Sequence, residues 1–203
     1  LGDVYKRQLS MPSKFGTISK VYATNEPLSD ISLSALQRNP LAITLYILSQ
    51  DVNGKLTYAS KTIRENLKNY LFEYMMVTDA VDFKDAYIVN IGVQYDVVLR
   101  PGTVARDVLL SCNEVIGDYL KTENRAINEP INLSELYTLI DQVQGVQTVK
   151  AVKILNLQGG NYSKYAYDVE AATKDNIVYP SYDPCIFEVR YPETDIVGRV
   201  VTL

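Results

Sequence analysis

Hydrophobic and polar positions alternate most regularly between Tyr87 and Arg100. The valine, isoleucine, tyrosine and leucine side chains at odd positions from 89 to 99 fall on one side of an extended chain. Asn90, Gln94 and Asp96 fall on the other side. A period of two is typical of a β-strand with one buried face and one wetter face. We predict that this strand is the centre of the fold.

Helical spacing of apolar residues surrounds this strand. It begins at a capping box that starts with Thr62. It recurs after Thr103 and after Asn132, and we expect each of these two residues to cap the helix that follows it. A second strand pattern runs over residues 146–155, where a slip in phase at Lys150 indicates a bulge. The order predicts an α+β fold: a mixed or antiparallel sheet with helices packed on one face around a β-α-α-β core.

Shorter strand patterns flank this core. Residues 41–49 form a compact apolar run, and Asn53-Gly54 is a favoured pair for the turn of a tight hairpin. Near the other end, residues 185–191 alternate well, and residues 195–203 suggest one more short strand. We therefore expect β-rich segments on both sides of the core.

The same patterns suggest how the chain is divided. Residues 1–8 (LGDVYKRQ) lack a methionine and resemble translated adapter sequence, so we expect a non-native leader on a C-terminal fragment of a longer protein. Residues 9–60 would be a small β-rich segment, and residues 61–156 the central α+β domain. Residues 157–203 would form a C-terminal β or extended arm.

Composition narrows the classes of partner. Of 203 residues, 47% are apolar and 22% charged, and 20 basic against 24 acidic side chains give a net charge of −4. This balance does not indicate nucleic-acid binding, and no apolar run approaches the roughly 20 residues of a membrane span. Cys112 and Cys185 lack metal-binding spacing, so we expect buried, reduced thiols.

The chain contains no histidine, which excludes Ser-His-Asp and Cys-His catalysis and histidine metal sites. Acidic residues cluster only loosely, at Asp79 and Asp82 and again at Asp183, Glu188 and Asp195. We interpret them as turn caps or solvated charges. No catalytic residue, cofactor or metal site is predicted, and we do not expect an enzyme.

Several passages, taken together, resemble one family. In chain order they are LKNYL at 67–71, TDAV at 78–81, INEPI at 127–131, LSEL at 133–136, VQGV at 143–146, YPS at 179–181, DP at 183–184, IFEVRYP at 186–192 and DIVGRVV at 195–201. Their order and spacing resemble the C-terminal region of the baseplate J-like wedge proteins of T-even-like contractile-tailed phages. The resemblance covers residues 13–203. One departure is Glu73-Tyr74-Met75, where the family often has a Tyr-Arg pair.

The resemblance implies a structural role. Wedge proteins of this family associate with one another and with other wedge proteins to build the inner ring of the baseplate. Such a protein would be located in the tail baseplate of the virion, and in the host cytoplasm during assembly. The aromatic and proline content near the C-terminus suggests six candidate interface residues: Tyr179, Tyr182, Ile186, Phe187, Tyr191 and Ile196.

Two other interpretations stay open. The first is a ferredoxin-like ligand-binding or regulatory module, in which a βααβ unit dimerises around a small molecule. The second is an enzyme that uses Asp, Lys or Tyr, which requires a deep pocket with a strongly perturbed ionisable group. An assembly protein instead predicts a broad exposed apolar patch on the isolated chain.

Overall fold

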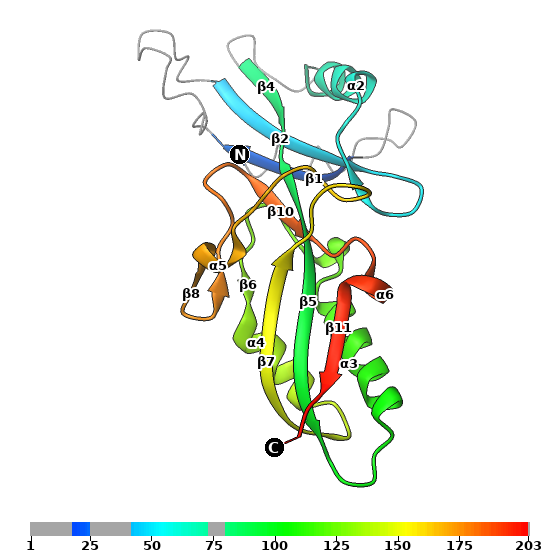
Figure 1. Ribbon diagram of the computed structural model, residues 1–203. Helices are drawn as coiled ribbons and strands as arrows, with labels where there is room; N and C mark the ends of the chain where they lie inside the picture. Colours follow the sequence, from blue (N-terminus) through cyan, green and yellow to red (C-terminus); the bar gives the residue numbers. More distant parts are fainter. Residues whose placement is uncertain (1–17, 25–41, 73–79, 203) are drawn as a thin grey trace. The chain divides into compact units, whose positions relative to one another are not determined.

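The structure is a computed structural model that describes residues 18–24, 42–72 and 80–202. The chain forms two compact units (Figure 1). The first comprises residues 1–87 and 182–185, and the second comprises residues 88–181 and 186–203. Helices and mixed sheets are both present, as expected for the predicted α+β class.

The first unit is built around strand β2 (Ala42–Gln50), which is the predicted apolar run. Strand β1 (Ile18–Thr24) pairs with it in antiparallel fashion. On the other side, β3 (Leu56–Thr57) pairs antiparallel and β4 (Ala80–Asp85) pairs parallel with β2. The sequence patterns did not separate β4 from the long strand that follows it.

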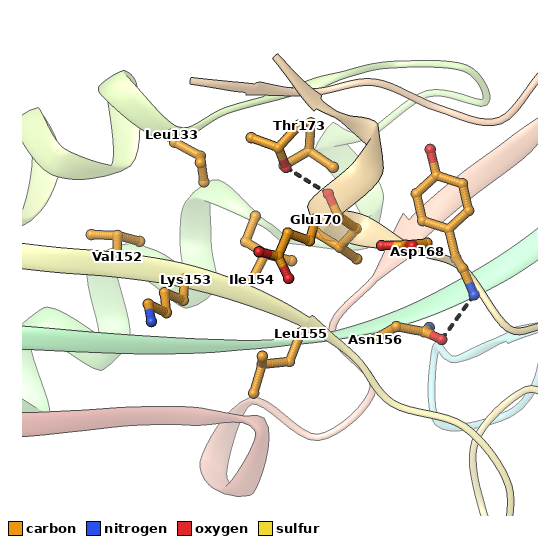
Figure 2. A pocket seen from close by; sticks show the side chains of 12 residues that line it. Leu133, Val152, Lys153, Ile154, Leu155, Asn156, Asp168, Glu170 and Thr173 are labelled. Carbon is orange, nitrogen blue, oxygen red and sulfur yellow. Dashed lines mark hydrogen bonds between the residues drawn. The ribbon is translucent and has the colours of Figure 1, made fainter. Parts of the chain in front are cut away.

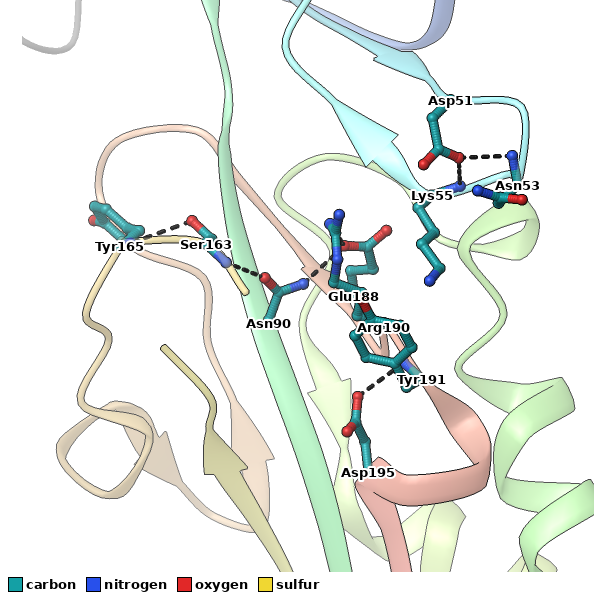
Figure 3. Close-up of polar contacts among 10 residues, drawn as sticks. All are labelled: Asp51, Asn53, Lys55, Asn90, Ser163, Tyr165, Glu188, Arg190, Tyr191 and Asp195. Carbon is teal, nitrogen blue, oxygen red and sulfur yellow. Dashed lines mark hydrogen bonds and ion pairs between the residues drawn. The ribbon is translucent and has the colours of Figure 1, made fainter. Parts of the chain in front are cut away.

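A tight turn joins β2 to β3, as the Asn53-Gly54 pair predicts. Gly54 has a φ of 75°, a conformation that glycine adopts without steric cost. The Asp51 carboxylate accepts hydrogen bonds from the backbone N–H groups of Asn53 (2.8 Å) and Lys55 (2.9 Å), which holds the turn closed (Figure 3).

Helix α2 (Lys61–Phe72) covers this sheet with Leu67 and Leu71, which pack in one core with residues of β1 and β2. Its N-terminal cap differs from the prediction. The Ser60 hydroxyl, rather than Thr62, accepts the backbone N–H of Ile63 (3.3 Å). Ser60 and Thr62, two hydroxyl residues separated only by Lys61, made the start of the helix ambiguous in sequence.

The second unit is organised around β5 (Tyr87–Leu99), the predicted central strand. Strand β7 (Val146–Asn156) pairs with it antiparallel, and its register shifts at Lys150, which confirms the predicted bulge. Strand β11 (Ile196–Val200) pairs with β5 in parallel, and β10 (Cys185–Glu188) also joins β5.

Helices α3 (Ala105–Tyr119) and α4 (Leu133–Asp141) lie on the same face of this sheet (Figure 1). Helix α3 packs against β11 and α4 packs against β7. Asn132 caps α4 as predicted, because its carboxamide oxygen accepts the N–H of Ser134 (3.0 Å). Thr103 does not cap α3. Its hydroxyl donates instead to the Arg100 carbonyl (2.8 Å) in the preceding turn.

The opposite face of the sheet carries no helix among the described residues of this unit. Gln94 and Asp96 are half-exposed there, in contrast to the buried Val93 and Tyr95 of the helix-covered face. Their neighbours in register are exposed as well: Lys153 on β7, and Val197 and Arg199 on β11.

Short elements complete the unit. A small sheet beside α4 has three strands, in the order β6 (Ile131–Asn132), β9 (Ile177–Val178) and β8 (Thr173–Lys174). The remaining helical turns are η3 (Thr122–Asn124), α5 (Val169–Ala172) and α6 (Pro192–Asp195).

Gly198 lets β11 lie against Tyr95. The two residues are paired in register, and the Tyr95 hydroxyl donates to the Asn113 side chain (2.7 Å) of α3. A Cβ at position 198 would lie 2.4 Å from the Tyr95 ring and 2.8 Å from Leu109. Because Tyr95 is buried and hydrogen-bonded, it cannot move aside, so this position of β11 requires glycine.

We expect Gly198→Ala to lower the free energy of unfolding by about 1–3 kcal/mol, because the added methyl group overpacks the contact with Tyr95. Chemical denaturation followed by circular dichroism measures this. Gly117→Ala in α3 is the matched control, since its Cβ would meet its nearest atoms at 3.8 Å and 4.0 Å. Alanine there should leave stability unchanged or raise it by up to about 1 kcal/mol. Equal losses in both variants would contradict the packing argument.

Candidate functional site

Asn90 is buried at the centre of a polar network in the second unit (Figure 3). Its amide nitrogen donates to the Glu188 carboxylate (2.7 Å) of β10, and its side-chain oxygen accepts the N–H of Ser163 (2.6 Å). The prediction that Asn90 lies on a wet face is therefore wrong. Its polar atoms are satisfied by protein groups, which is the condition for burying an amide.

The backbone carbonyl of Asn90 extends the network. It accepts hydrogen bonds from the N–H of Leu157 (2.9 Å) and from the side chain of Asn156 (3.0 Å). The Asn156 side-chain oxygen in turn accepts the N–H of Tyr167 (3.0 Å). One residue of β5 thus holds β10 and the chain between residues 156 and 167 in place.

Glu188 is 1% exposed, so the interpretation of this residue as a solvated charge or turn cap is wrong. Its carboxylate accepts from Asn90 and lies 3.6 Å from the guanidinium of Arg190. A buried carboxylate needs such partners because desolvation penalises the charged form. The alternating pattern of β10 showed which residues share a face but not that both faces are buried.

Asp195 caps a turn, as predicted, and is also buried. Its carboxylate accepts the N–H of Tyr191 (2.8 Å) and the hydroxyl of Tyr162 (2.6 Å). The hydrogen bond to the Asp195 carboxylate, with a smaller contribution from burial, raises the pKa of Tyr162 to about 12. Tyr162 therefore stays protonated and acts as a donor that fixes the turn at α6.

The other acidic residues of the sequence prediction lie elsewhere in the chain. Asp82 is exposed on β4, and Asp183 belongs to the first unit. Asp79 lies outside the described residues. The described residues contain no group of three or more His, Cys, Asp or Glu side chains that could hold a metal ion.

Both cysteines are buried thiols that form no disulfide, as predicted. Burial raises the pKa of the Cys112 thiol. The pKa of the Tyr95 hydroxyl is also raised, mainly by burial and to a smaller extent by the interaction with Cys112. A thiol held in its protonated form is a poor nucleophile. The Cys112 and Tyr95 pair therefore has the character of a packing contact between α3 and β5.

A groove of about 470 Å³ lies beside β7 (Figure 2). One wall consists of the consecutive residues Val152–Asn156 of β7, and the opposite wall consists of α5 and the chain next to it. Leu133, at the start of α4, lies at one end. No sequence pattern pointed to this groove, because its two walls lie apart in the sequence. The remaining lining residues are Tyr167, Asp168, Val169, Glu170, Thr173 and Val178.

The six predicted interface residues differ widely in exposure. Ile186, Phe187 and Ile196 are 1–3% exposed and pack in the interior of the second unit. Tyr191 is half-buried. Tyr179 and Tyr182 are 45% and 76% exposed, but they belong to different units. Only these last two side chains are freely available to a partner in this structure.

Comparison with known proteins adds little to this description. No protein-family profile and no curated protein sequence matches the chain. Among solved structures, a chain of the baseplate of the anti-feeding prophage matches with a TM-score of 0.49 and 11% identity. The match covers 98% of the present chain, which spans 37% of the length of that baseplate chain. A likeness of this degree does not indicate a shared function.

Among the described residues, no helix has both the length and the apolar character needed to cross a membrane.

We expect Asn90→Asp to lower the free energy of unfolding by about 2–4 kcal/mol at neutral pH. The new carboxylate cannot donate to Glu188 and would face it at about 2.7 Å as a like charge. Gln94→Glu is the matched control on the half-exposed part of the same face, where we expect a change within about 0.5 kcal/mol. Urea denaturation of both variants measures the difference.

The pH dependence of the same variant checks the cause. Two carboxyl groups at this distance share a proton, so the folded state would bind more protons than the unfolded state. Stability of the Asn90→Asp variant should therefore rise relative to the parent protein as the pH falls from 7 towards 4. A deficit that stays the same at both pH values would exclude like-charge repulsion as its origin.

Proposed function

We propose that the chain is a structural subunit of the baseplate of a contractile phage tail. The observation that carries this proposal is the ordered series of passages that resemble baseplate J-like wedge proteins over residues 13–203. Each passage is short, and their common order and spacing support the proposal more strongly than any one of them does.

The location of two passages supports it further. Residues 127–146 form the connection from α3 through α4 to β7, and their apolar positions Ile131, Leu136 and Ile140 are fully buried. Residues 186–201 form most of β10, then α6 and β11. These two stretches are thus parts of the scaffold of the second unit. A resemblance at such positions concerns the fold of that unit.

The finer proposal is self-association, together with contacts to other wedge proteins in the inner ring. Tyr179 and Tyr182 support it, because exposed tyrosines offer large rigid contact surfaces and are enriched at protein interfaces. The helix-free face of the sheet, with Val197 at 42% exposure, offers a second surface. A chain with these roles is expected in the tail baseplate of the virion and is not expected to be an enzyme.

Localisation tests the baseplate role. We expect an antibody against this chain to label the distal end of purified contractile tails, viewed by electron microscopy, from the phage or prophage that encodes it. Antibody first absorbed with the purified chain is the control. Label along the sheath, or intact tails that carry none, would overturn the proposal.

Sedimentation velocity tests self-association. We expect the chain to sediment faster as its concentration rises through the micromolar range, and a Tyr182→Ser, Tyr179→Ser double variant to associate about tenfold more weakly. Tyr58→Ser is the matched control, because Tyr58 is 50% exposed. Deleting residues 180–203 would not serve, since it removes β10 and β11 from the sheet. Sedimentation as a monomer at every concentration would contradict self-association.

A further inference from the structure

The edge of β7 that faces away from β5 is open within the described sheet, where β7 pairs with β5 alone. The backbone N–H of Val152 donates to the Tyr137 hydroxyl (2.9 Å) of α4, so at Val152 the backbone groups point away from β5. Because this direction repeats at every second residue, the N–H and C=O of Ile154 also point outward. The Tyr137 hydroxyl closes one end of this edge, and Ile154 is the next open position.

The groove beside β7 follows this edge. Five consecutive strand residues, Val152–Asn156, line it, although the side chains of neighbouring strand residues point to opposite faces. What these five residues share is the backbone edge, so the groove borders on the unpaired hydrogen-bonding groups. Its volume of about 470 Å³ lies within the usual range of ligand sites, roughly 300–1,000 Å³.

The walls of the groove combine an apolar floor with acidic charge. Val169 and Val178 are buried, at 7% and 0% exposure, and line the wall opposite Ile154. In Figure 2 the carboxylate of Glu170 projects from α5 towards β7. Glu170 is exposed, and its side-chain carboxylate has no ion-pair or hydrogen-bond partner among the residues that the structure describes. The neighbouring Asp168 carboxylate accepts the N–H of Ala171 (3.0 Å) and adds a second negative charge.

We propose that this groove binds an extended peptide segment of another protein, which adds to the free edge of β7 at Ile154. Its backbone supplies the missing donor and acceptor, an apolar side chain packs against the accessible part of Val169, and a lysine or arginine lies beside Glu170. The two acidic side chains against the one ammonium group of Lys153 favour a basic segment. Addition of a strand requires the backbone of the peptide to be free, so a proline at the pairing position prevents it.

This inference is independent of the baseplate role. It depends on the edge and the groove of the second unit, which would bind a peptide whatever larger assembly contains the chain.

Binding of defined peptides tests the proposal. The probes are fluorescein-labelled heptapeptides, amidated at the C-terminus, in which valine alternates with lysine. One matched set carries glutamate in place of each lysine, and a second matched set carries a proline at the central position. We expect the valine–lysine set to bind the full chain saturably in fluorescence anisotropy. The glutamate and proline sets should bind at least about tenfold more weakly.

Variants of the chain locate the site. Glu170→Lys should weaken binding of the valine–lysine peptides about five- to tenfold. Glu114→Lys on α3 is the matched control and should leave binding unchanged, because it makes the same charge reversal at an exposed glutamate of the same unit. Backbone amide NMR signals of Ile154 and Glu170 should shift on titration. No saturable binding, shifts confined to other surfaces, or equal effects of the two variants would overturn the proposal.

N-methylation of the peptide backbone distinguishes strand addition from a contact made by side chains alone. Only alternate N–H groups of an added strand face β7. Methylation at one set of alternate positions should abolish binding, and methylation at the other set should not. If neither set affects binding, the peptide does not pair with β7 and the proposal fails.

Discussion

The buried carboxamide of Asn90 is the constraint on which the second unit depends. An amide removed from water stabilises a fold only when each of its donors and acceptors has a partner. Here the partners come from β10 and from the loop at Ser163, which lie 98 and 73 positions from Asn90 in the sequence. The Asn90 side chain is fully paired only when both segments are in position, so the network favours the arrangement in which β10 and the loop at Ser163 both lie beside β5.

The sheet around β5 is unequal on its two faces and at its edges. Helices α3 and α4 bury one face, where Gly198 and Tyr95 allow β11 to approach closely. The other face, and the edge of β7 next to α5, keep polar groups and charges within reach of other molecules. Both faces contribute to stability, because the helices pack on one of them and the buried network of Asn90 lies on the other. The surfaces from which we infer association and peptide binding are the parts of the unit that neither the helices nor this network covers.

Much of the fold follows from local patterns, and the candidate sites do not. The period of two predicts β5 and β7, and the phase slip at Lys150 predicts the bulge, because both depend on neighbouring residues. The burial of Asn90 and Glu188 depends on partners far away in sequence, which alternation cannot reveal. The same holds for the groove beside β7. The cap at Ser60 and the short helix α5 were missed because several polar residues there could begin a helical turn.

The parallel pairing of β11 with β5 also affects how the chain can fold while it is being synthesised. Gly198 and Tyr95 are partners 103 positions apart, and the intervening chain includes α3, α4 and β7. At a synthesis rate of roughly 5–20 residues per second, β5 leaves the ribosome about 5–20 s before its neighbour β11. During that interval the antiparallel strand β7 can already pair with β5, while the opposite edge of β5 stays open. A nascent chain of this protein therefore passes through a stage at which that edge is vulnerable to pairing with other chains, and the arrival of β11 ends it.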